Sequence, residues 1–267
     1  MSFLNLSFYK FTHLEAPDSA QKWLQNFLKS TEIRGTILLA HEGINASLAG
    51  PEQHMRSLQE LFALDSRFQN LPYKESRSAT QPFTRMFVKI KKEIVTMGVP
   101  EVNPALKSAP NMEPQELKRW LDEKRCFLLI DTRNDYEVKL GTFEGAADFC
   151  IESFRDFPAK VRSLSAAEKQ LPVVTFCTGG ILCEKAAPLM LELGFADVYQ
   201  LNGGILNYFK ECGGTHWNGE CFVFDDRVAV NPELEVTGAS ICAVCQYPVP
   251  KNKTKCTNCV ETNYPHE

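Results

Sequence analysis

Hydrophobic and polar positions follow two different patterns along the chain. In the N-terminal third, period-two alternation and short apolar runs predict strands, and apolar residues spaced three and four apart predict helices. The order is strand, helix, strand, strand, helix, strand, which is typical of a ferredoxin-like α+β domain with one open sheet face. The predicted strands span 3–11, 33–40, 45–49 and 85–96, and the predicted helices span 18–28 and 51–64.

Beyond residue 113, β-rich apolar runs alternate with helical stretches, which predicts an α/β domain with a parallel sheet flanked by helices. The strands are expected at 127–130, 173–176 and 198–201, and the helices at 114–124, 154–163 and 183–193. Four prolines separate the two patterns, and each removes a backbone donor. We therefore predict a first domain over 1–97, a linker over 98–113, a second domain over 114–212 and a small Cys-rich tail over 213–267.

Composition places the chain among globular proteins, with 44% hydrophobic and 23% charged residues among 267. The apolar runs reach about five residues, against roughly 20 needed to cross a bilayer, so no membrane partner is expected. The N-terminus lacks the layout of a secretory signal, which predicts a cytoplasmic location. In a cytosolic chain, ten cysteines indicate metal binding or thiol chemistry rather than disulfides.

Charge is divided unevenly behind the net value of −4. Residues 1–95 hold 12 Lys/Arg against 9 Asp/Glu, whereas the rest holds 17 against 24, so only the first part suits a polyanion. Period-two alternation places Arg85, Lys89 and Lys91 on one face of the last predicted strand, with Phe87 as a stacking group. Together with Lys92 these cations predict a nucleic-acid contact, and a solvated strand face is the alternative.

The strongest signal for chemistry is a cysteine between a buried strand and a helix. Cys177 ends the apolar run 173–176 and begins a glycine-containing loop that leads into the predicted helix at Cys183. Such a loop can aim several backbone N–H groups at one sulfur, and the helix dipole favours a thiolate or persulfide there. A small buried structural cysteine is the alternative, but it would not need the glycines. The loop comprises Thr178, Gly179, Gly180, Ile181 and Leu182.

The remaining cysteines divide into three groups. Cys183 lies six residues after Cys177 and suits a resolving thiol, although a core position on the helix is an equal alternative. Two Cys-x-x-Cys pairs in the tail have the spacing of a structural zinc site, with a redox-active dithiol pair as the competitor. The expected zinc ligands are Cys242, Cys245, Cys256 and Cys259. Structural roles are expected for Cys126, Cys150, Cys212 and Cys221.

Four segments resemble a rhodanese domain: 129–137, 141–146, the Cys177 loop and 201–205. The resemblance implies that Cys177 carries sulfur as a persulfide, while Asp131 and Arg133 support the loop. For these two charged residues, a structural ion pair is favoured over direct catalysis.

Segments 35–50, 91–98 and 219–228 extend the resemblance to bacterial tRNA uridine hydroxylases that contain a rhodanese domain. It implies oxygen-dependent conversion of the wobble uridine to 5-hydroxyuridine, with the tRNA anticodon arm as partner. Leu182 departs from the pattern, since that family usually has an arginine there. His41 and Glu42 fit a hydrogen-bonded turn, and only the resemblance favours a substrate contact.

Uracil carbon 5 is a poor nucleophile until a group adds to carbon 6, and a Cys177 thiolate can make that addition. Alternatively, the sulfur can carry activated oxygen, and the sequence does not choose. No motif identifies a redox cofactor, so the reductant stays unassigned. A persulfide-carrying sulfurtransferase is the alternative function, and Leu182 would support a third, a non-catalytic RNA-binding module. The N-terminal domain favours the hydroxylase.

Overall fold

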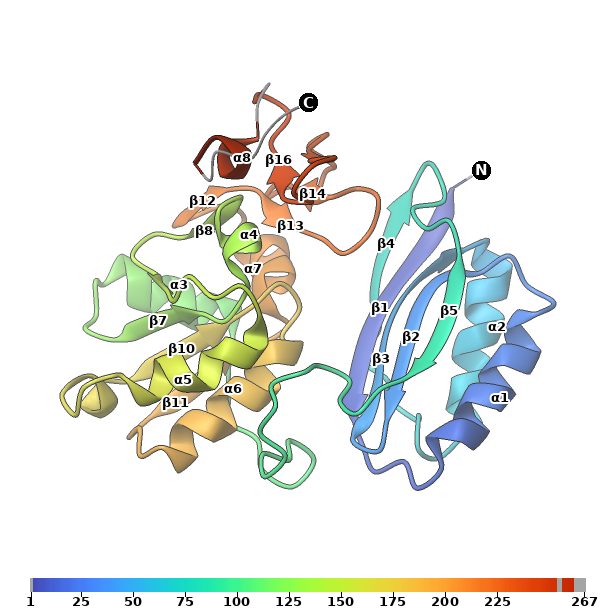
Figure 1. The fold of residues 1–267 in the computed structure, drawn as a ribbon, viewed down its shortest axis with the longest axis horizontal. Helices are drawn as coiled ribbons and strands as arrows, with labels where there is room; N and C mark the ends of the chain where they lie inside the picture. Colours follow the sequence, from blue (N-terminus) through green and yellow to red (C-terminus); the bar gives the residue numbers. More distant parts are fainter. Residues whose placement is uncertain (1, 254–255, 262–267) are drawn as a thin grey trace. The chain divides into compact units, whose positions relative to one another are not determined.

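Two separate units make up the chain in this computed structural model, residues 1–96 and residues 97–267 (Figure 1). The structure describes residues 2–253 and 256–261. Each unit has its own sheet and its own buried core, so each is considered by itself.

The N-terminal unit is a five-stranded sheet with the strand order β4-β1-β3-β2-β5. Only the β2–β5 pair is parallel, and the first four strands in this order form the predicted ferredoxin-like arrangement. Its elements are β1 (Phe3–Phe11), α1 (Pro17–Leu28), β2 (Arg34–Ala40), β3 (Gly43–Gly50), α2 (Glu52–Ala63), β4 (Lys74–Ser78) and β5 (Met86–Ile90).

Helices α1 and α2 cover one face of this sheet. On α1, Pro17 starts the helix and Ala20, Leu24 and Leu28 repeat at four-residue spacing, so they form one buried stripe. Each fully buried leucine contributes roughly 2 kcal/mol of transfer free energy. Phe8 from β1 packs edge-on against Phe62 from α2, which joins the sheet to its helical layer.

The last strand of the N-terminal unit differs from its prediction. The segment expected as one strand over 85–96 forms only β5, so Arg85 precedes the strand and Lys91 and Lys92 follow it. Main-chain hydrogen bonds continue on both sides, from Gly35 N to Arg85 O and from Lys91 N to Leu39 O. The fourth strand of the ferredoxin-like arrangement is instead β4.

Strand β4 escaped prediction because its sequence, Lys-Glu-Ser-Arg-Ser, has no hydrophobic alternation. It forms an edge strand through its antiparallel register with β1, from Phe3 opposite Ser78 to Ser7 opposite Lys74. Ion pairs from Glu75 to Arg56 and from Arg77 to Glu52 connect it to α2. Polar edge strands of this kind protect a sheet from further pairing.

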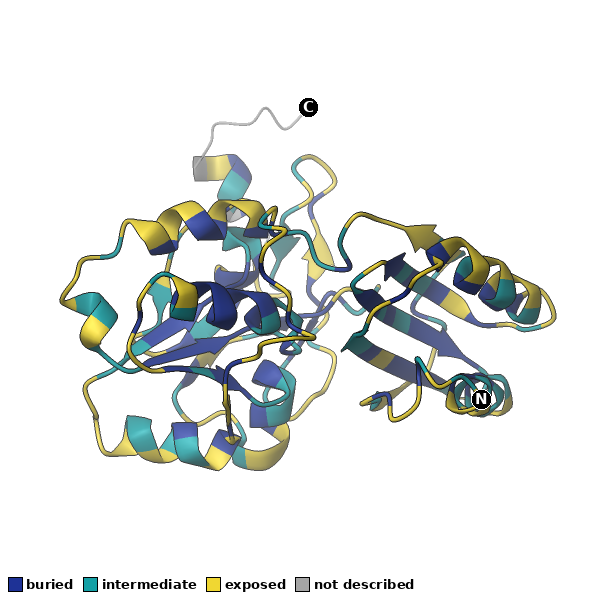
Figure 2. Cartoon of the chain, turned by 90° about the horizontal axis from the view of Figure 1, so that it is seen from below, coloured by how far each residue is buried: buried dark blue, intermediate teal, exposed yellow. Residues whose placement is uncertain are grey.

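The second unit contains the predicted parallel sheet, with the strand order β6-β11-β10-β7-β9. Figure 2 shows its buried strands enclosed by helices with exposed outer surfaces. Helices α3 and α7 pack together over one face, and α5 and α6 pack together over the other. The strands are β6 (Asn111–Met112), β7 (Leu128–Asp131), β9 (Ala147–Asp148), β10 (Val173–Phe176) and β11 (Val198–Leu201). The helices are α3 (Pro114–Asp122), α4 (Asp135–Val138), α5 (Phe157–Arg162), α6 (Ile181–Glu192) and α7 (Gly204–Cys212).

Three helices of this unit differ from the sequence prediction. The helix expected over 154–163 is split into a 3₁₀ turn, Phe154–Asp156, and α5, and a further 3₁₀ turn spans Glu168–Gln170. The sequence pattern missed α4 and α7. Helix α4 has only four residues, too few for a helical period to be visible.

The C-terminal segment begins as part of the second unit's core. Strand β12 (Trp217–Gly219) pairs with β8 (Gly141–Phe143), and Trp217 and Cys221 belong to the same buried cluster as Phe176. The remaining elements are the pair β13 (Cys221–Phe222) with β14 (Ala229–Val230), the pair β15 (Ser240–Ile241) with β16 (Pro248–Val249), and α8 (Thr257–Glu261).

The helices of the described segments are short, with at most 12 residues in α1, α2 and α6. None of the helices in those segments has both the length and the apolar character needed to span a bilayer.

Candidate active site

Cys177 lies where β10 ends and the chain turns into α6. Its side chain is 2% exposed, and Gly180 N donates a hydrogen bond to its Sγ over 3.0 Å. Gly180 has a φ of 98°, a left-handed conformation that a side chain would strain, and it caps the N-terminus of α6. The local sequence therefore directs a backbone N–H group at the sulfur, a geometry that suits an anionic side chain.

The pKa of Cys177 is lowered to about 6 by the groups that surround it. Burial by itself would raise this pKa, but hydrogen bonds from the Cys183 thiol and from backbone N–H groups outweigh it. The backbone donors belong to Leu182, Gly180 and Gly179. A pKa lowered in this way favours the thiolate at neutral pH, and the thiolate is the form that acts as a nucleophile.

Cys183 is fully buried on the first turn of α6 and hydrogen-bonds to Cys177. Its Sγ also lies 3.8 Å from Thr132 Oγ1, whose hydroxyl bonds to the Phe176 carbonyl over 2.9 Å. Burial and the neighbouring Cys177 sulfur raise the pKa of Cys183 well above its usual value. In this geometry the Cys183 thiol stays protonated and donates a hydrogen bond to the Cys177 sulfur.

Asp131 and Arg133 form a buried, bidentate ion pair at the end of β7. Arg133 Nε lies 2.9 Å from Asp131 Oδ1, and Nη2 lies 2.7 Å from Oδ2. Arg133 Nη2 also donates to the Gly141 carbonyl, and Thr142 Oγ1 donates to Asp131. Burial opposes the charge of Arg133, but Asp131 outweighs it and the pKa of the guanidinium is raised. The pair joins β7 to β8.

Helix α7 supports the reactive loop from the other side. Ile205 N donates to the Cys177 carbonyl over 2.9 Å, and Leu206 N donates to the Thr178 carbonyl over 3.2 Å. Gly204 has a φ of 70°, and a Cβ there would lie 2.4 Å from the Cys177 carbonyl oxygen. The glycines at 203 and 204 thus allow α7 to begin directly against the loop.

Two residues that the sequence did not assign to this site, Glu137 and Cys221, complete the surroundings of the loop. Glu137, on α4, is buried, and its Oε1 lies 3.4 Å from Thr178 Oγ1. Cys221, expected to be structural, is buried close enough to Thr178 and Arg133 to be affected by both. An acidic residue between apolar neighbours, as Glu137 is, was the only sequence signal for this cluster.

The four tail cysteines come together, with their sulfur atoms within 4.8 Å of one another. Cys242 Sγ lies 3.7 Å from Cys259 Sγ, and Cys245 Sγ lies 3.4 Å from Cys256 Sγ. Tetrahedral Zn–S bonds of about 2.3 Å place sulfurs roughly 3.8 Å apart, so this group has the dimensions of a metal site.

A second group of metal-binding residue types, Asp135, Asp148 and Cys150, is partly exposed and already makes other contacts. Asp135 pairs with Lys139 and accepts a hydrogen bond from Tyr247, and Asp148 accepts one from Cys150 N. These contacts account for the cluster without an ion.

The basic residues near β5 lie on the sheet's surface. Met86 and Val88 pack against the helix-covered core, so Phe87 and Lys89 project from the opposite face. Lys89 Nζ lies 4.4 Å from the centroid of the Phe87 ring, which is 39% exposed. Within the part of the chain that the structure describes, four cations here have no ion-pair partner: Arg85, Lys89, Lys91 and Lys92.

His41 and Glu42 form the turn between β2 and β3. His41 Nδ1 lies 2.9 Å from the Leu14 carbonyl, and Glu42 Oε1 accepts a hydrogen bond from Ile94 N over 2.7 Å. These contacts are those of the hydrogen-bonded turn that the residue types indicated.

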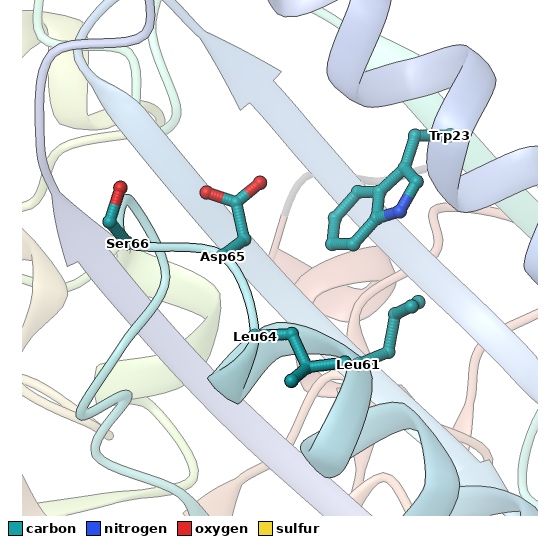
Figure 3. A pocket seen from close by; sticks show the side chains of 5 residues that line it. All are labelled: Trp23, Leu61, Leu64, Asp65 and Ser66. Atoms are coloured by element: carbon teal, nitrogen blue, oxygen red, sulfur yellow. The ribbon is translucent and has the colours of Figure 1, made fainter.

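A surface depression lies in the N-terminal unit, whose sequence contains no cysteine. Trp23 of α1 faces the end of α2 and the turn that follows it (Figure 3). The residues that line it are Trp23, Leu61, Leu64, Asp65 and Ser66. This set contains neither a cation nor a reactive thiol, so the depression is not the site of the chemistry.

Each of the two units matches a known protein family. Residues 3–94 match the family described as UPF0176 acylphosphatase like domain, and residues 113–211 match the family described as rhodanese-like domain. Among solved structures, a rhodanese-like domain from Anabaena is 24% identical, with a TM-score of 0.34, over 41% of this chain and 79% of that one. A human single-domain sulfurtransferase is 22% identical, with a TM-score of 0.33, over 39% of this chain and 97% of that one.

Curated relatives cover nearly the whole chain. A tRNA uridine(34) hydroxylase of Cupriavidus necator is 47% identical over 251 residues, which are 92% of this chain and 89% of the relative. The protein of the same name from Cupriavidus metallidurans is 43% identical, over 98% of both chains. That from Burkholderia pseudomallei is 43% identical, over 94% of this chain and 87% of the relative.

The fold and the cysteine loop define the class of protein: an acylphosphatase-like domain followed by a rhodanese-like domain with a buried cysteine at the start of its loop. With relatives this similar over this length, the chain belongs to the tRNA uridine(34) hydroxylase family and is an enzyme.

Proposed function

We propose that this enzyme hydroxylates carbon 5 of the wobble uridine in tRNA, with Cys177 as the reactive group and molecular oxygen as the oxidant. The observation that carries the proposal is the thiolate of Cys177, held by the α6 N-terminus in a chain similar to tRNA uridine(34) hydroxylases. One oxygen atom enters the base and the other leaves as water, so the reaction consumes two electrons and two protons from an added reductant. The tRNA substrate favours the predicted cytoplasmic location.

Addition of the Cys177 thiolate to carbon 6 activates carbon 5, because it converts the C5–C6 double bond into an enolate-like nucleophile. A wobble base that leaves the anticodon stack can reach such a thiolate. The lowered pKa of about 6 favours this role, since the thiolate is then the predominant form at neutral pH. Cys183 stabilises the thiolate by donating its hydrogen bond, and it acts as a resolving thiol only if Cys177 becomes oxidised.

The exposed face beside β5 is the proposed contact for the anticodon arm. Lys89 and Phe87 offer a cation and a stacking ring side by side, which suits a phosphate and an unpaired base. Arg85, Lys91 and Lys92 extend the positive charge along the chain on either side of the strand.

The four tail cysteines are the proposed ligands of one structural zinc ion, because their spacing and separations fit tetrahedral thiolate coordination. A redox-active dithiol needs only two neighbouring cysteines, so it does not explain why all four sulfur atoms lie within 4.8 Å of one another.

Complementation of a deletion strain tests the function. Cys177→Ser replaces the thiolate with an un-ionised hydroxyl, so tRNA from that strain should lack 5-hydroxyuridine although the variant still binds tRNA. Cys212→Ser is the matched control, because Cys212 lies outside the loop and the cluster, and it should restore the nucleoside. Normal 5-hydroxyuridine with Cys177→Ser would exclude the sulfur from the reaction.

A covalent trap separates the two roles of the sulfur. With 5-fluorouridine at the wobble position, addition at carbon 6 leaves an adduct between Cys177 and tRNA that survives denaturing electrophoresis. A sulfenic acid on Cys177, captured by dimedone without such an adduct, would instead assign oxygen activation to the sulfur.

A further inference from the structure

A buried carboxyl group behind the reactive loop has no part in the chemistry described so far. Glu137 is 1% exposed, and its Oε2 accepts a hydrogen bond from Asn134 N over 3.2 Å. Its Oε1 lies 3.4 Å from Thr178 Oγ1. Thr178 directly follows Cys177 and is half-buried, so it is the more exposed residue of the two.

The Thr178 hydroxyl has two acceptors within reach but one proton. Its Oγ1 lies 3.4 Å from the Phe222 carbonyl as well as 3.4 Å from Glu137. A carbonyl only accepts, so an ionised Glu137 competes with Phe222 for the single hydroxyl proton. A protonated Glu137 donates to Thr178, which then donates to Phe222, and both contacts are satisfied. The arrangement therefore accommodates Glu137 with or without its proton.

Burial and charged neighbours act in opposite directions on Glu137. Burial raises its pKa to about 7, while the Arg133 guanidinium and the Asn134 N–H oppose the rise, and Asp131 and the Cys177 thiolate add to it. The remaining titratable groups that interact with it are Tyr136 and Cys221. The negative charge of Cys177 raises the pKa of Glu137, so the ionisation of the carboxyl group depends on the state of the sulfur.

We propose that Glu137 accepts the carbon-5 proton of the hydroxylated uracil, acting through the Thr178 hydroxyl. The inference rests on the proposed function, because it concerns the adduct between Cys177 and carbon 6. In that adduct, carbon 5 has gained its hydroxyl and still carries its hydrogen.

The step balances in atoms and charge. Thr178 Oγ1 takes the proton from carbon 5 while its own proton passes to the Glu137 carboxylate. The C5–H electron pair forms the C5–C6 double bond, and the C6–S electron pair returns to Cys177. The products are 5-hydroxyuridine, the Cys177 thiolate and a protonated Glu137, which then releases its proton to water.

The test compares release with adduct formation in the full-length enzyme. Glu137→Gln keeps the size of the side chain but cannot accept the proton, so hydroxylation should fall about 100-fold or more. A covalent complex with unmodified tRNA should accumulate in this variant and not in the parent. Turnover of the parent should rise with pH through about 7, since the base must be ionised, and this dependence should disappear in Glu137→Gln.

Two further variants distinguish proton transfer from support of the fold. Thr178→Val removes the relay hydroxyl and should accumulate the same complex, whereas Thr178→Ser restores a hydroxyl and should recover turnover at least tenfold over Thr178→Val. Glu144→Gln is the control for loss of an acidic group, because Glu144 is exposed in the same unit, and it should leave turnover unchanged.

The outcomes separate this inference from the proposed function. If the parent forms no adduct with 5-fluorouridine tRNA, the addition to carbon 6 is wrong and the inference fails with it. If the parent forms that adduct but Glu137→Gln turns over normally, with an unchanged pH profile and no trapped complex, only the role of Glu137 is wrong.

Discussion

Single residues around Cys177 decide how much charge the loop can stabilise. The backbone N–H of Leu182 lowers the pKa of the Cys177 thiol. The leucine side chain adds no charge at this position, where the family resemblance leads us to expect an arginine. The buried Asp131–Arg133 pair holds the nearby guanidinium in its own bidentate bond. Removing either partner of such a pair leaves an unpaired buried charge and costs about 3–5 kcal/mol. Stabilisation of the thiolate therefore depends chiefly on hydrogen bonds.

Leu182→Arg tests whether a nearby positive charge would stabilise the thiolate further. A cation within about 6 Å of the sulfur should lower the pKa of Cys177 by roughly one unit and raise turnover. The rate of alkylation by iodoacetamide at different pH values measures the pKa of Cys177. The rate for the parent should rise with pH through about 6 and level off by pH 8, whereas the alkylation rate of an ordinary cysteine still rises at pH 8. Leu182→Met is the uncharged control. An unchanged midpoint in Leu182→Arg would mean that the arginine side chain does not reach the sulfur.

At the scale of helices and strands, two short helices hold the Cys177 loop in place. The start of α7 packs against the loop backbone, and the four-residue helix α4 presents Glu137 to Thr178. On its outer side, α4 contacts the Cys-rich segment, where the rings of Tyr136 and Tyr247 pack edge-on and Lys139 lies over Tyr247. The cysteine cluster thus supports the helix that carries Glu137.

Gly204→Ala should damage the contact between α7 and the loop. A positive φ costs any alanine about 1–2 kcal/mol, and the clash with the Cys177 carbonyl should add roughly 1–3 kcal/mol. Gly145→Ala is the matched control, since Gly145 also has a positive φ but no atom within 4 Å of the added Cβ. Urea unfolding measures both variants. Equal losses of stability would show that the close approach at Gly204 is unimportant.

Metal content tests the Cys-rich segment. Purified protein should contain about one equivalent of zinc, Cys242→Ser should lose most of it, and Cys212→Ser should keep it. Chelation should lower the melting temperature by several degrees, because the α4 contacts made by Tyr247 lose their anchor. Zinc far below one equivalent in the parent, with no effect of Cys242→Ser, would contradict the assignment.

At the scale of the whole molecule, the proposed tRNA binding and the proposed chemistry belong to different units. The thiolate, its hydrogen-bond donors and the buried acid all belong to the second unit, whereas the exposed cations with an adjacent aromatic ring belong to the first. Variants of the two units should therefore affect different kinetic constants, with binding lost in one case and turnover in the other.

Charge reversal at Lys89 and Lys91 should weaken tRNA binding at least tenfold while the unfolding transition stays unchanged. Each lost phosphate contact should reduce the slope of log affinity against log salt by about one. The control is charge reversal at Lys22 and Lys29, which are exposed on and just beyond α1, in the layer that covers the other face of the sheet. Equal effects of the two double variants would place the tRNA contact elsewhere.

Features carried by neighbouring residues could be predicted from the sequence. The strand, the glycine loop around Cys177 and the four-cysteine spacing are each contained in a short stretch, so local periodicity and residue type are sufficient to identify them. The ferredoxin-like arrangement and the parallel sheet followed from the order of such stretches, and both are confirmed.

Only the tertiary structure decided the features that depend on distant pairing. Strand β4 has no pattern of its own and forms because β1 offers it an edge. Glu137 and Thr178 are 41 residues apart, and Phe222 follows 44 residues later, so their contact exists only once α4, the loop and β13 have packed together. The same burial that joins these groups removes water from the carboxyl group and raises its pKa, an effect no local sequence pattern contains.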